Sequence, residues 1–326
     1  MSAAAAIGAG VLGQGVAFAH ALAQARALRL PHALLVTGAM GTGKTLASRA
    51  LAQALLCEGP QPASACGACT PCRKVAQDQH PDLLLLTVPE DKTEIPVEHV
   101  RELQSHLQLH ALEGRARVAL VDPADALNEQ GQNALLKTLE EPGTNTFLLL
   151  PTSQPEALLP TVRSRVGRLA LRPLEPAGLA QLLAARGHPD REKNALAAEA
   201  ARGSLGRAEV LVAEDLAALV ALADQALVGD PQESAPALAR RALAGASGRA
   251  QVEARARHFL HLVRWRLLAR VGAALAAGDD PAYCPGPLDR WISQGETLCD
   301  IETDLDLSVP PEQALTGALL RLQDCS

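Results

Sequence analysis

Residues 38–45 read Gly-Ala-Met-Gly-Thr-Gly-Lys-Thr, and this octapeptide decides the fold class. It matches Gly-x-x-x-x-Gly-Lys-Ser/Thr, the pattern of a loop whose backbone N–H groups surround phosphate oxygens. Lys44 brings a cation to the β- and γ-phosphates, and Thr45 brings a hydroxyl to magnesium. The glycines that permit the tight turn are Gly38, Gly41 and Gly43. A chance glycine turn would not need every fixed position, so we predict a nucleotide-binding loop.

Apolar runs and helical stretches alternate around this loop as far as residue 172. The predicted strands cover residues 33–37, 82–88, 117–122, 146–150 and 167–172. The predicted helices of the same region cover residues 15–29, 46–56, 96–110 and 130–141. This alternation predicts an α/β fold with a doubly wound, five-stranded parallel sheet. Residues 11–14 form either a loop against a nucleotide base or a plain lead-in to the first helix.

Polar residues at the ends of two strands are further candidates for the nucleotide site. Asp122 closes the third strand, where a carboxylate would hold magnesium; a helix cap is the alternative. The next residue is Pro123, which has no carboxylate to orient an attacking water. Thr152 and Ser153 follow the fourth strand, either as sensors of the γ-phosphate or as a simple turn.

A cluster of cysteines indicates a metal site. Four of the seven cysteines lie between residues 57 and 72, with two consecutive Cys-x-x-Cys steps. Prolines and a glycine among them predict a loop-like knuckle. Four thiolates would satisfy tetrahedral zinc and leave no open position, so the predicted site is structural; four unrelated thiols are the alternative. The predicted ligands are Cys57, Cys66, Cys69 and Cys72.

The composition limits the class of protein. The chain has 326 residues, of which 48% are hydrophobic and only 2% aromatic, so Leu, Ala and Val must build the core. A formal net charge of -6 argues against a protein that binds DNA by itself. Neither a signal peptide nor an apolar run of about 18 residues is evident, which predicts a cytoplasmic protein without a membrane segment.

The sequence Pro-Leu-Glu-Pro at residues 173–176 marks a domain boundary, after which no strand is predicted. We expect a nucleotide-binding domain over residues 1–172 that contains the knuckle, a helical lid over 173–212, and a helical collar or oligomerisation domain over 213–326. Eight arginines against one glutamate occupy residues 240–270. They form either a DNA-facing stripe or a solvated or subunit-facing surface.

Several segments resemble the bacterial clamp-loader subunits of the AAA+ family, and together they cover nearly the whole chain. They are residues 133–142, 164–166 in place of a Ser-Arg-Cys motif, 203–207 in place of a second sensor, the cysteine cluster, 80–82, 97–103 and 314–322. Two departures favour the delta-prime type over the gamma/tau type. Pro123 replaces the catalytic acid, and Gly206 replaces the sensor arginine, with Arg207 one step later.

This resemblance implies an AAA+ nucleotide-binding domain in a clamp-loader subunit of the DNA polymerase III holoenzyme. Such a subunit serves DNA replication and is expected to have no activity of its own. It is grouped with DNA-directed DNA polymerases, which are nucleotidyltransferases, because it is part of their holoenzyme. The implied partners are the gamma/tau and delta subunits and, through them, the sliding clamp and primed DNA. The implied cofactors are structural zinc and ATP with magnesium.

Arg165 has a specific role in this resemblance. It would be the arginine that the subunit offers in trans to a neighbouring ATP site, whereas pairing with an acid of its own chain is the alternative. Little or no hydrolysis is expected from the chain itself, and an ATP-hydrolysing motor of the gamma/tau type is the alternative function.

Overall fold

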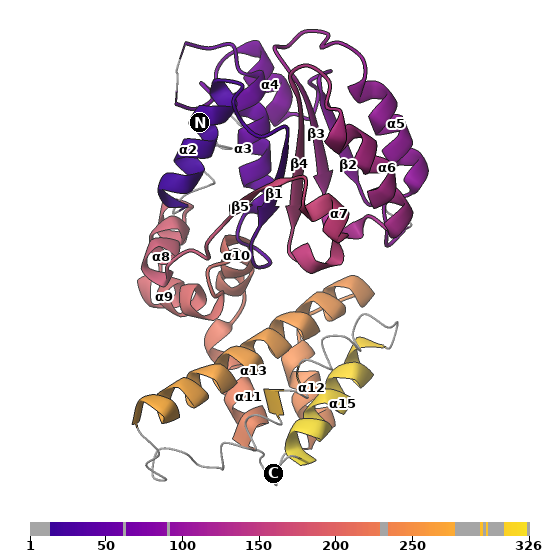
Figure 1. The fold of residues 1–326 in the computed structure, drawn as a ribbon. Helices are drawn as coiled ribbons and strands as arrows, with labels where there is room; N and C mark the ends of the chain where they lie inside the picture. The colour runs from indigo at the N-terminus through magenta and orange to yellow at the C-terminus, as the bar shows by residue number, and fades with distance from the viewer. Residues whose placement is uncertain are drawn as a thin grey trace. The chain divides into compact units, whose positions relative to one another are not determined.

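The computed structural model describes residues 14–60, 63–89, 92–228, 234–277, 294, 295, 298 and 310–324 (Figure 1). The chain divides into two compact units, Met1–Leu182 with Arg202–Arg207, and Leu183–Ala201 with Ala208–Ser326. The division into three domains at residues 172 and 212 stays a prediction.

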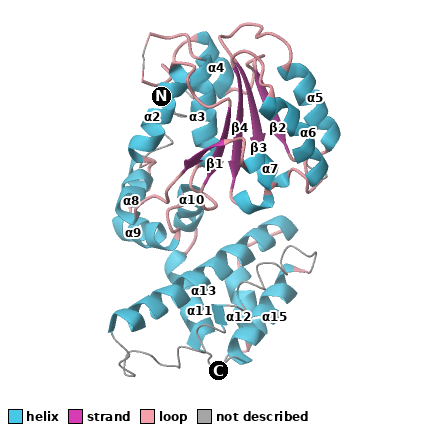
Figure 2. Ribbon diagram, in the orientation of Figure 1, coloured by secondary structure: helices cyan, strands magenta, loops and turns pink. Residues whose placement is uncertain are grey.

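A parallel sheet of five strands forms the centre of the first unit, as the sequence predicts (Figure 2). The strands follow the order β2-β3-β4-β1-β5, and every neighbouring pair is parallel. Their bounds are β1 (Ala33–Thr37), β2 (Leu83–Thr87), β3 (Arg117–Asp122), β4 (Thr146–Thr152) and β5 (Gly167–Ala170). Because the strands are parallel, their carboxyl ends meet at one edge of the sheet, where such folds bind ligands.

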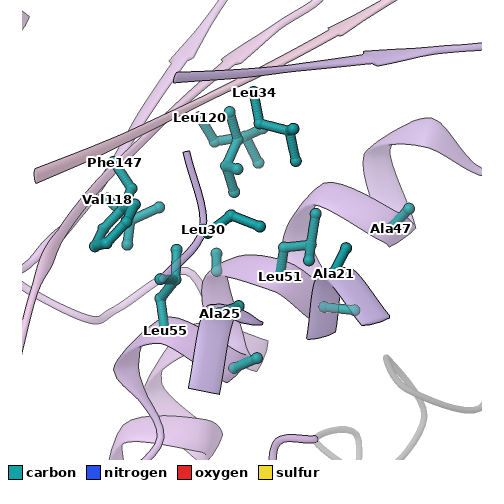
Figure 3. Packing of buried hydrophobic residues seen from close by; sticks show 14 of the residues in the cluster. Ala21, Ala25, Leu30, Leu34, Ala47, Leu51, Leu55, Val118, Leu120 and Phe147 are labelled. Carbon is teal, nitrogen blue, oxygen red and sulfur yellow. The ribbon is translucent and has the colours of Figure 1, made fainter. Parts of the chain in front are cut away.

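Helices cover both faces of the sheet, which is why its strands are apolar along their length. On one face, α2 (Gly15–Arg26) and α3 (Lys44–Leu56) pack on a cluster of strand side chains that includes Phe147 (Figure 3). On the other face, α5 (Val97–Leu107) and α6 (Glu129–Glu140) bury their leucines and valine against the same strands. All seven residues of β4 are buried, so this strand lies at the centre of both cores.

Besides α5, which ends at Leu107 instead of residue 110, two helices differ from the sequence prediction. The first, α2, ends at Arg26 instead of residue 29, because Leu28 takes a left-handed conformation with φ of 53° and turns the chain toward β1. The second, α4 (Thr70–Ala76), occupies part of the segment that was predicted to be a loop-like knuckle. Its Pro71 lies in the first turn, where a helix tolerates proline.

Beyond β5, the described residues form helices joined by loops and no strand, as predicted. Helices α8 (Pro176–Ala185), α9 (Arg191–Ala200) and α10 (Leu205–Ala213) occupy the segment that was predicted to be a helical lid, and α10 extends one residue beyond it. In the second unit, four helices pack against one another in every pairing. They are α11 (Leu216–Val228), α12 (Ala235–Leu243), α13 (Arg249–Ala277) and α15 (Pro311–Asp324). No helix within the described residues is long and apolar enough to cross a membrane.

A buried carboxylate fixes the loop that leads into β3. The side chain of Asp82 is fully buried, and its oxygens accept backbone N–H groups of Leu112 at 2.7 Å, Glu113 at 2.9 Å and Gly114 at 2.7 Å. The buried guanidinium of Arg117 lies 3.9 Å away. Burial alone would raise the pKa of Asp82, but the three N–H donors outweigh it and hold the pKa below its ordinary value.

We therefore predict that Asp82→Asn destabilises the protein. An amide cannot accept all three N–H groups, and each buried donor left without an acceptor costs about 1–3 kcal/mol of unfolding free energy. The same pairing predicts acid sensitivity: a lowered folded-state pKa stabilises the protein at neutral pH, and this contribution is lost as the pH falls below about 4. Urea unfolding at pH 7 and pH 3 measures both effects.

The matched control is Asp78→Asn, because Asp78 is half-exposed and pairs with Arg49 at 2.8 Å at the surface. Exposed pairs contribute about 0.2–1 kcal/mol. Equal losses of stability in the two variants would contradict the role assigned to Asp82.

Candidate nucleotide edge and metal knuckle

The phosphate-binding loop lies where the sequence predicts it, between the carboxyl end of β1 and the first turn of α3. Gly43 immediately precedes the helix with φ of 84°, a conformation that glycine adopts without strain. The Lys44 ammonium donates hydrogen bonds to the backbone carbonyls of Gly38 at 3.0 Å and Ala39 at 2.9 Å. Thr45 is exposed at the start of the helix. In this structure the Lys44 ammonium binds carbonyls of its own loop, and a bound phosphate would replace them as its partner.

A second glycine of the loop meets the segment that resembles a sensor. Gly41 has φ of 80°, and a β-carbon there would lie 1.9 Å from the hydroxyl oxygen of Ser204. That hydroxyl also accepts the backbone N–H of Arg207 at 3.2 Å and so caps the first turn of α10. The tip of the loop is thus in direct contact with the beginning of α10.

The strand-end candidates come together beside the loop, with one addition. Asp122 ends β3 and Thr152 ends β4, on the same edge of the sheet as the loop. The added residue is Asp125, whose carboxylate accepts the Thr152 hydroxyl and, at 3.2 Å, the Ser153 N–H. Asp125 lies three residues past the end of β3, at a position that no sequence motif assigns to this site.

The structure shows whether Asp122 and Thr152 take the local structural roles that were the alternatives for them. Asp122 does not cap the helix that follows, because Asn128 caps α6 through its side chain. Thr152 is fully buried and its hydroxyl also accepts the N–H of Gln154 at 3.0 Å, so it orders the chain after β4. Whether Thr152 and Ser153 also respond to a γ-phosphate stays a prediction.

The charges at this edge act on Lys44. Burial lowers the pKa of Lys44 below its ordinary value, while Asp125 and then Asp122 oppose that fall. Both carboxylates therefore contribute negative charge in the surroundings of the Lys44 ammonium. Residues 11–13 lie outside the described residues, but Gln14 exchanges two hydrogen bonds with the backbone of Arg172, at 2.8 and 2.9 Å.

Arg165 follows α7 (Pro160–Arg163) and is exposed, yet it has partners on its own chain. Two of its nitrogens lie 2.8 and 3.1 Å from one carboxylate oxygen of Glu140. The third donates to the carbonyl of Thr161 at 3.0 Å and lies 3.3 Å from the hydroxyl of Ser164. Arg165 therefore pairs with an acid of its own chain in this structure, which contains no other chain.

Several arginines of the stripe at 240–270 are likewise paired within the second unit. Arg266 and Arg270 both contact Asp224, at 2.9 and 3.1 Å. Arg257 pairs with Glu253 at 2.9 Å, and Arg255 lies 3.8 Å from Glu214. These pairs account for part of the positive charge that the sequence places in this segment.

The four predicted metal ligands converge in the structure. The thiol sulfurs of Cys57, Cys66, Cys69 and Cys72 all lie within 4.8 Å of one another. The Cys66–Cys72 distance is 4.0 Å and the Cys57–Cys69 distance is 3.9 Å between sulfurs. Tetrahedral zinc with bonds of about 2.3 Å places its sulfurs about 3.8 Å apart. The donor set and its spacing therefore fit a structural zinc ion.

Backbone N–H groups around the sulfurs also suit thiolates. Cys57 Sγ accepts the N–H groups of Gly59 and Cys66, each at 3.3 Å, and Cys66 Sγ accepts that of Cys69 at 3.3 Å. The N–H groups of Ala68 and Cys69 lower the pKa of Cys66 to about 6. Burial raises the pKa of both Cys57 and Cys72, so a metal would have to displace their protons.

The strand order and the loop at the carboxyl edge define a phosphate-loop protein of the AAA+ class. Residues 14–175 match the family described as "DNA polymerase III, delta subunit". Over these residues, just under half of the chain, it is similar to clamp-loader subunits of DNA polymerase III, delta-prime subunits among them.

The chain is similar to the following three proteins. The DNA polymerase III subunit delta' of Pseudomonas aeruginosa is 41% identical over 165 residues, which are 51% of this chain and 50% of that protein. The tau subunit of Escherichia coli is 37% identical over 45% of this chain and 22% of its own length. A solved gamma-subunit-related protein from Thermotoga maritima is 18% identical, with a TM-score of 0.44 over 92% of this chain and 97% of its own. The chain spans about half the length of the delta-prime relative.

The geometry of the knuckle predicts about one zinc per chain in protein purified without chelators. Cys66→Ser should lose the metal, because it removes one of four ligands, while the phosphate-binding loop keeps its structure. Elemental analysis of both proteins measures the change. Wild-type protein that is folded and free of metal would contradict the prediction.

Proposed function

We propose that the chain acts as the delta-prime subunit of a bacterial clamp loader in DNA replication. In this role it joins gamma/tau and delta subunits in an assembly that uses ATP to place a sliding clamp on primed DNA. Two observations support the proposal: residues 14–175 match the family described as "DNA polymerase III, delta subunit", and the chain is 41% identical over 165 residues to a delta-prime subunit. The nucleotide edge, the knuckle and Arg165 all lie within residues 14–175. Co-purification from the host, with identification of the proteins that accompany it, is the direct test.

Within this role the chain binds ATP and magnesium with little or no turnover. The loop supplies Lys44 and Thr45, and Asp122 supplies a carboxylate at the end of β3. Two groups that would assist hydrolysis are replaced, since Pro123 cannot orient water and Gly206 carries no guanidinium. Asp125 is a candidate for the magnesium or phosphate environment as well, because it shares this edge with Thr152.

A gamma/tau-type motor is the second candidate function. The complete phosphate-binding loop and the 37% identity to a tau subunit favour it. The two functions differ in steady-state ATP hydrolysis by the pure chain, which only the motor should carry out at an appreciable rate.

We predict that isothermal titration detects ATP binding and that Lys44→Ala abolishes it, because the variant loses the cation that faces the β- and γ-phosphates. Lys92→Ala is the matched control, since Lys92 is exposed and outside the loop. An unchanged affinity in Lys44→Ala would contradict the assigned site. A motor-like rate of hydrolysis by the wild-type chain would favour the gamma/tau reading.

Arg165 serves the neighbouring subunit in this proposal. Its place on the exposed segment after α7 supports a guanidinium that reaches across an interface, where a planar fork stabilises transferring phosphoryl groups. The pairing with Glu140 does not oppose this role, because exposed ion pairs contribute only about 0.2–1 kcal/mol. Binding to the neighbour would exchange Glu140 for a phosphate.

We predict that Arg165→Ala folds and joins the complex, whereas clamp-stimulated ATP hydrolysis and clamp loading fall by several-fold. The loss should be smaller than the roughly 10³–10⁵-fold effect of an arginine finger at a single site, since other sites of the assembly stay intact. Arg165→Lys should not restore the rate, and Arg168→Ala, an exposed arginine of β5, is the matched control. An Arg165→Ala complex that hydrolyses ATP at the unmodified rate would exclude the trans role.

A further inference from the structure

A buried arginine approaches the metal knuckle from α2, outside the segment that contains the cysteines. Arg26 is only 9% exposed although it ends a surface helix. One terminal nitrogen donates to the carbonyl of Cys57 and lies 3.4 Å from that of Ala54; the other donates to Gly59 at 2.5 Å. Its fork therefore contacts the carbonyl of the first predicted ligand, Cys57, and those of Ala54 and Gly59, three residues before it and two residues after it.

Two further side chains, those of Arg115 and Gln53, contact the backbone carbonyls of the predicted metal ligands. The guanidinium of Arg115 lies 3.5 Å from the carbonyl of Cys57 and 3.3 Å from that of Arg26. The buried amide of Gln53 donates to the carbonyl of Cys72 at 2.9 Å. Two arginines thus converge on Cys57, and an amide fixes Cys72, the other fully buried ligand.

The charges around the four cysteines favour a cationic side chain such as Arg26 beside a zinc site. Zinc bound by four thiolates has a net charge of about −2. The cluster also lies at the carboxyl end of α3, where the helix dipole and the last carbonyls add partial negative charge. A mostly buried guanidinium that binds those carbonyls offsets both contributions and restricts Cys57 to one backbone position.

We propose that Arg26 is a positioning residue for the metal knuckle. Its guanidinium compensates the charge of a zinc–tetrathiolate centre and holds the backbone of the first ligand, Cys57, in place. This inference rests on the proposed zinc. It assigns to α2 a function in metal retention, in addition to its packing on the sheet.

The test is the affinity of the full chain for zinc, measured by competition with a chromogenic chelator. Arg26→Gln should weaken zinc binding about 10–100-fold, the usual effect of removing a group that orients a metal ligand. Arg26→Lys keeps the positive charge but loses the planar fork of the guanidinium, so its affinity for zinc should lie between those of Arg26→Gln and the wild type. The matched control is Arg29→Gln, an equal change of charge at an exposed residue on the same segment, which should bind zinc like wild type.

Thermal unfolding separates this role from a purely structural one. The substitution Arg26→Gln is made in two backgrounds: the zinc-loaded wild-type chain and the Cys66→Ser chain, in which the metal site is broken. It should lower the Tm more in the first background than in the second. If Arg26→Gln does not fold, the zinc affinity of Arg26→Lys relative to the wild type tests the proposal instead. Zinc affinity equal to that of Arg29→Gln, or equal losses of Tm in both backgrounds, would overturn the proposal. A wild-type chain that binds no zinc would overturn it together with the assignment of the metal.

Discussion

The parallel sheet imposes the constraint on which the first unit depends. Parallel strands must be covered on both faces, so each crossover passes through a helix and every strand ends at the same edge. β4 has all seven of its residues buried and lies between β3 and β1. It therefore brings the end of β3, with Asp122, to the same edge as the loop after β1, although 77 residues separate Thr45 from Asp122 in the sequence. Residues that lie far apart in the chain share one site for this reason.

Features that depend on local chemistry could be predicted from the sequence. Apolar runs identified five strands, the glycine-rich octapeptide identified the loop, and the Cys-x-x-Cys spacing identified four thiols that converge within 4.8 Å. Each of these signals depends on a few neighbouring residues. The helix α4 was missed because its seven residues include Pro71 and Cys72, and so short a segment has no apolar period to recognise.

Features that depend on contacts between distant segments could not be predicted. Asp125 reaches Thr152 because a short 3₁₀ turn, Ala124–Ala126, directs it back toward β4, and nothing in residues 122–126 indicates that direction. Glu140, a partner of Arg165, ends α6, and Cys57, a partner of Arg26, directly follows α3; the sequence separations are 25 and 31 residues. Isolated arginines in a sequence give no indication of such pairing, because their long side chains can reach many neighbours.

The reciprocal pair between Gln14 and Arg172 has a consequence for solubility. Leu171 donates its N–H to Thr37 of β1, so the backbone of Arg172 faces the opposite, outer side of the sheet. The carboxamide of Gln14 donates to the Arg172 carbonyl and accepts its N–H, as the peptide group of an adjacent strand would. An edge with such a cover offers fewer free backbone groups to a second chain, and edge-to-edge pairing is a common route to aggregation. A single glutamine side chain thus protects the backbone just beyond the edge strand β5 from unwanted self-association.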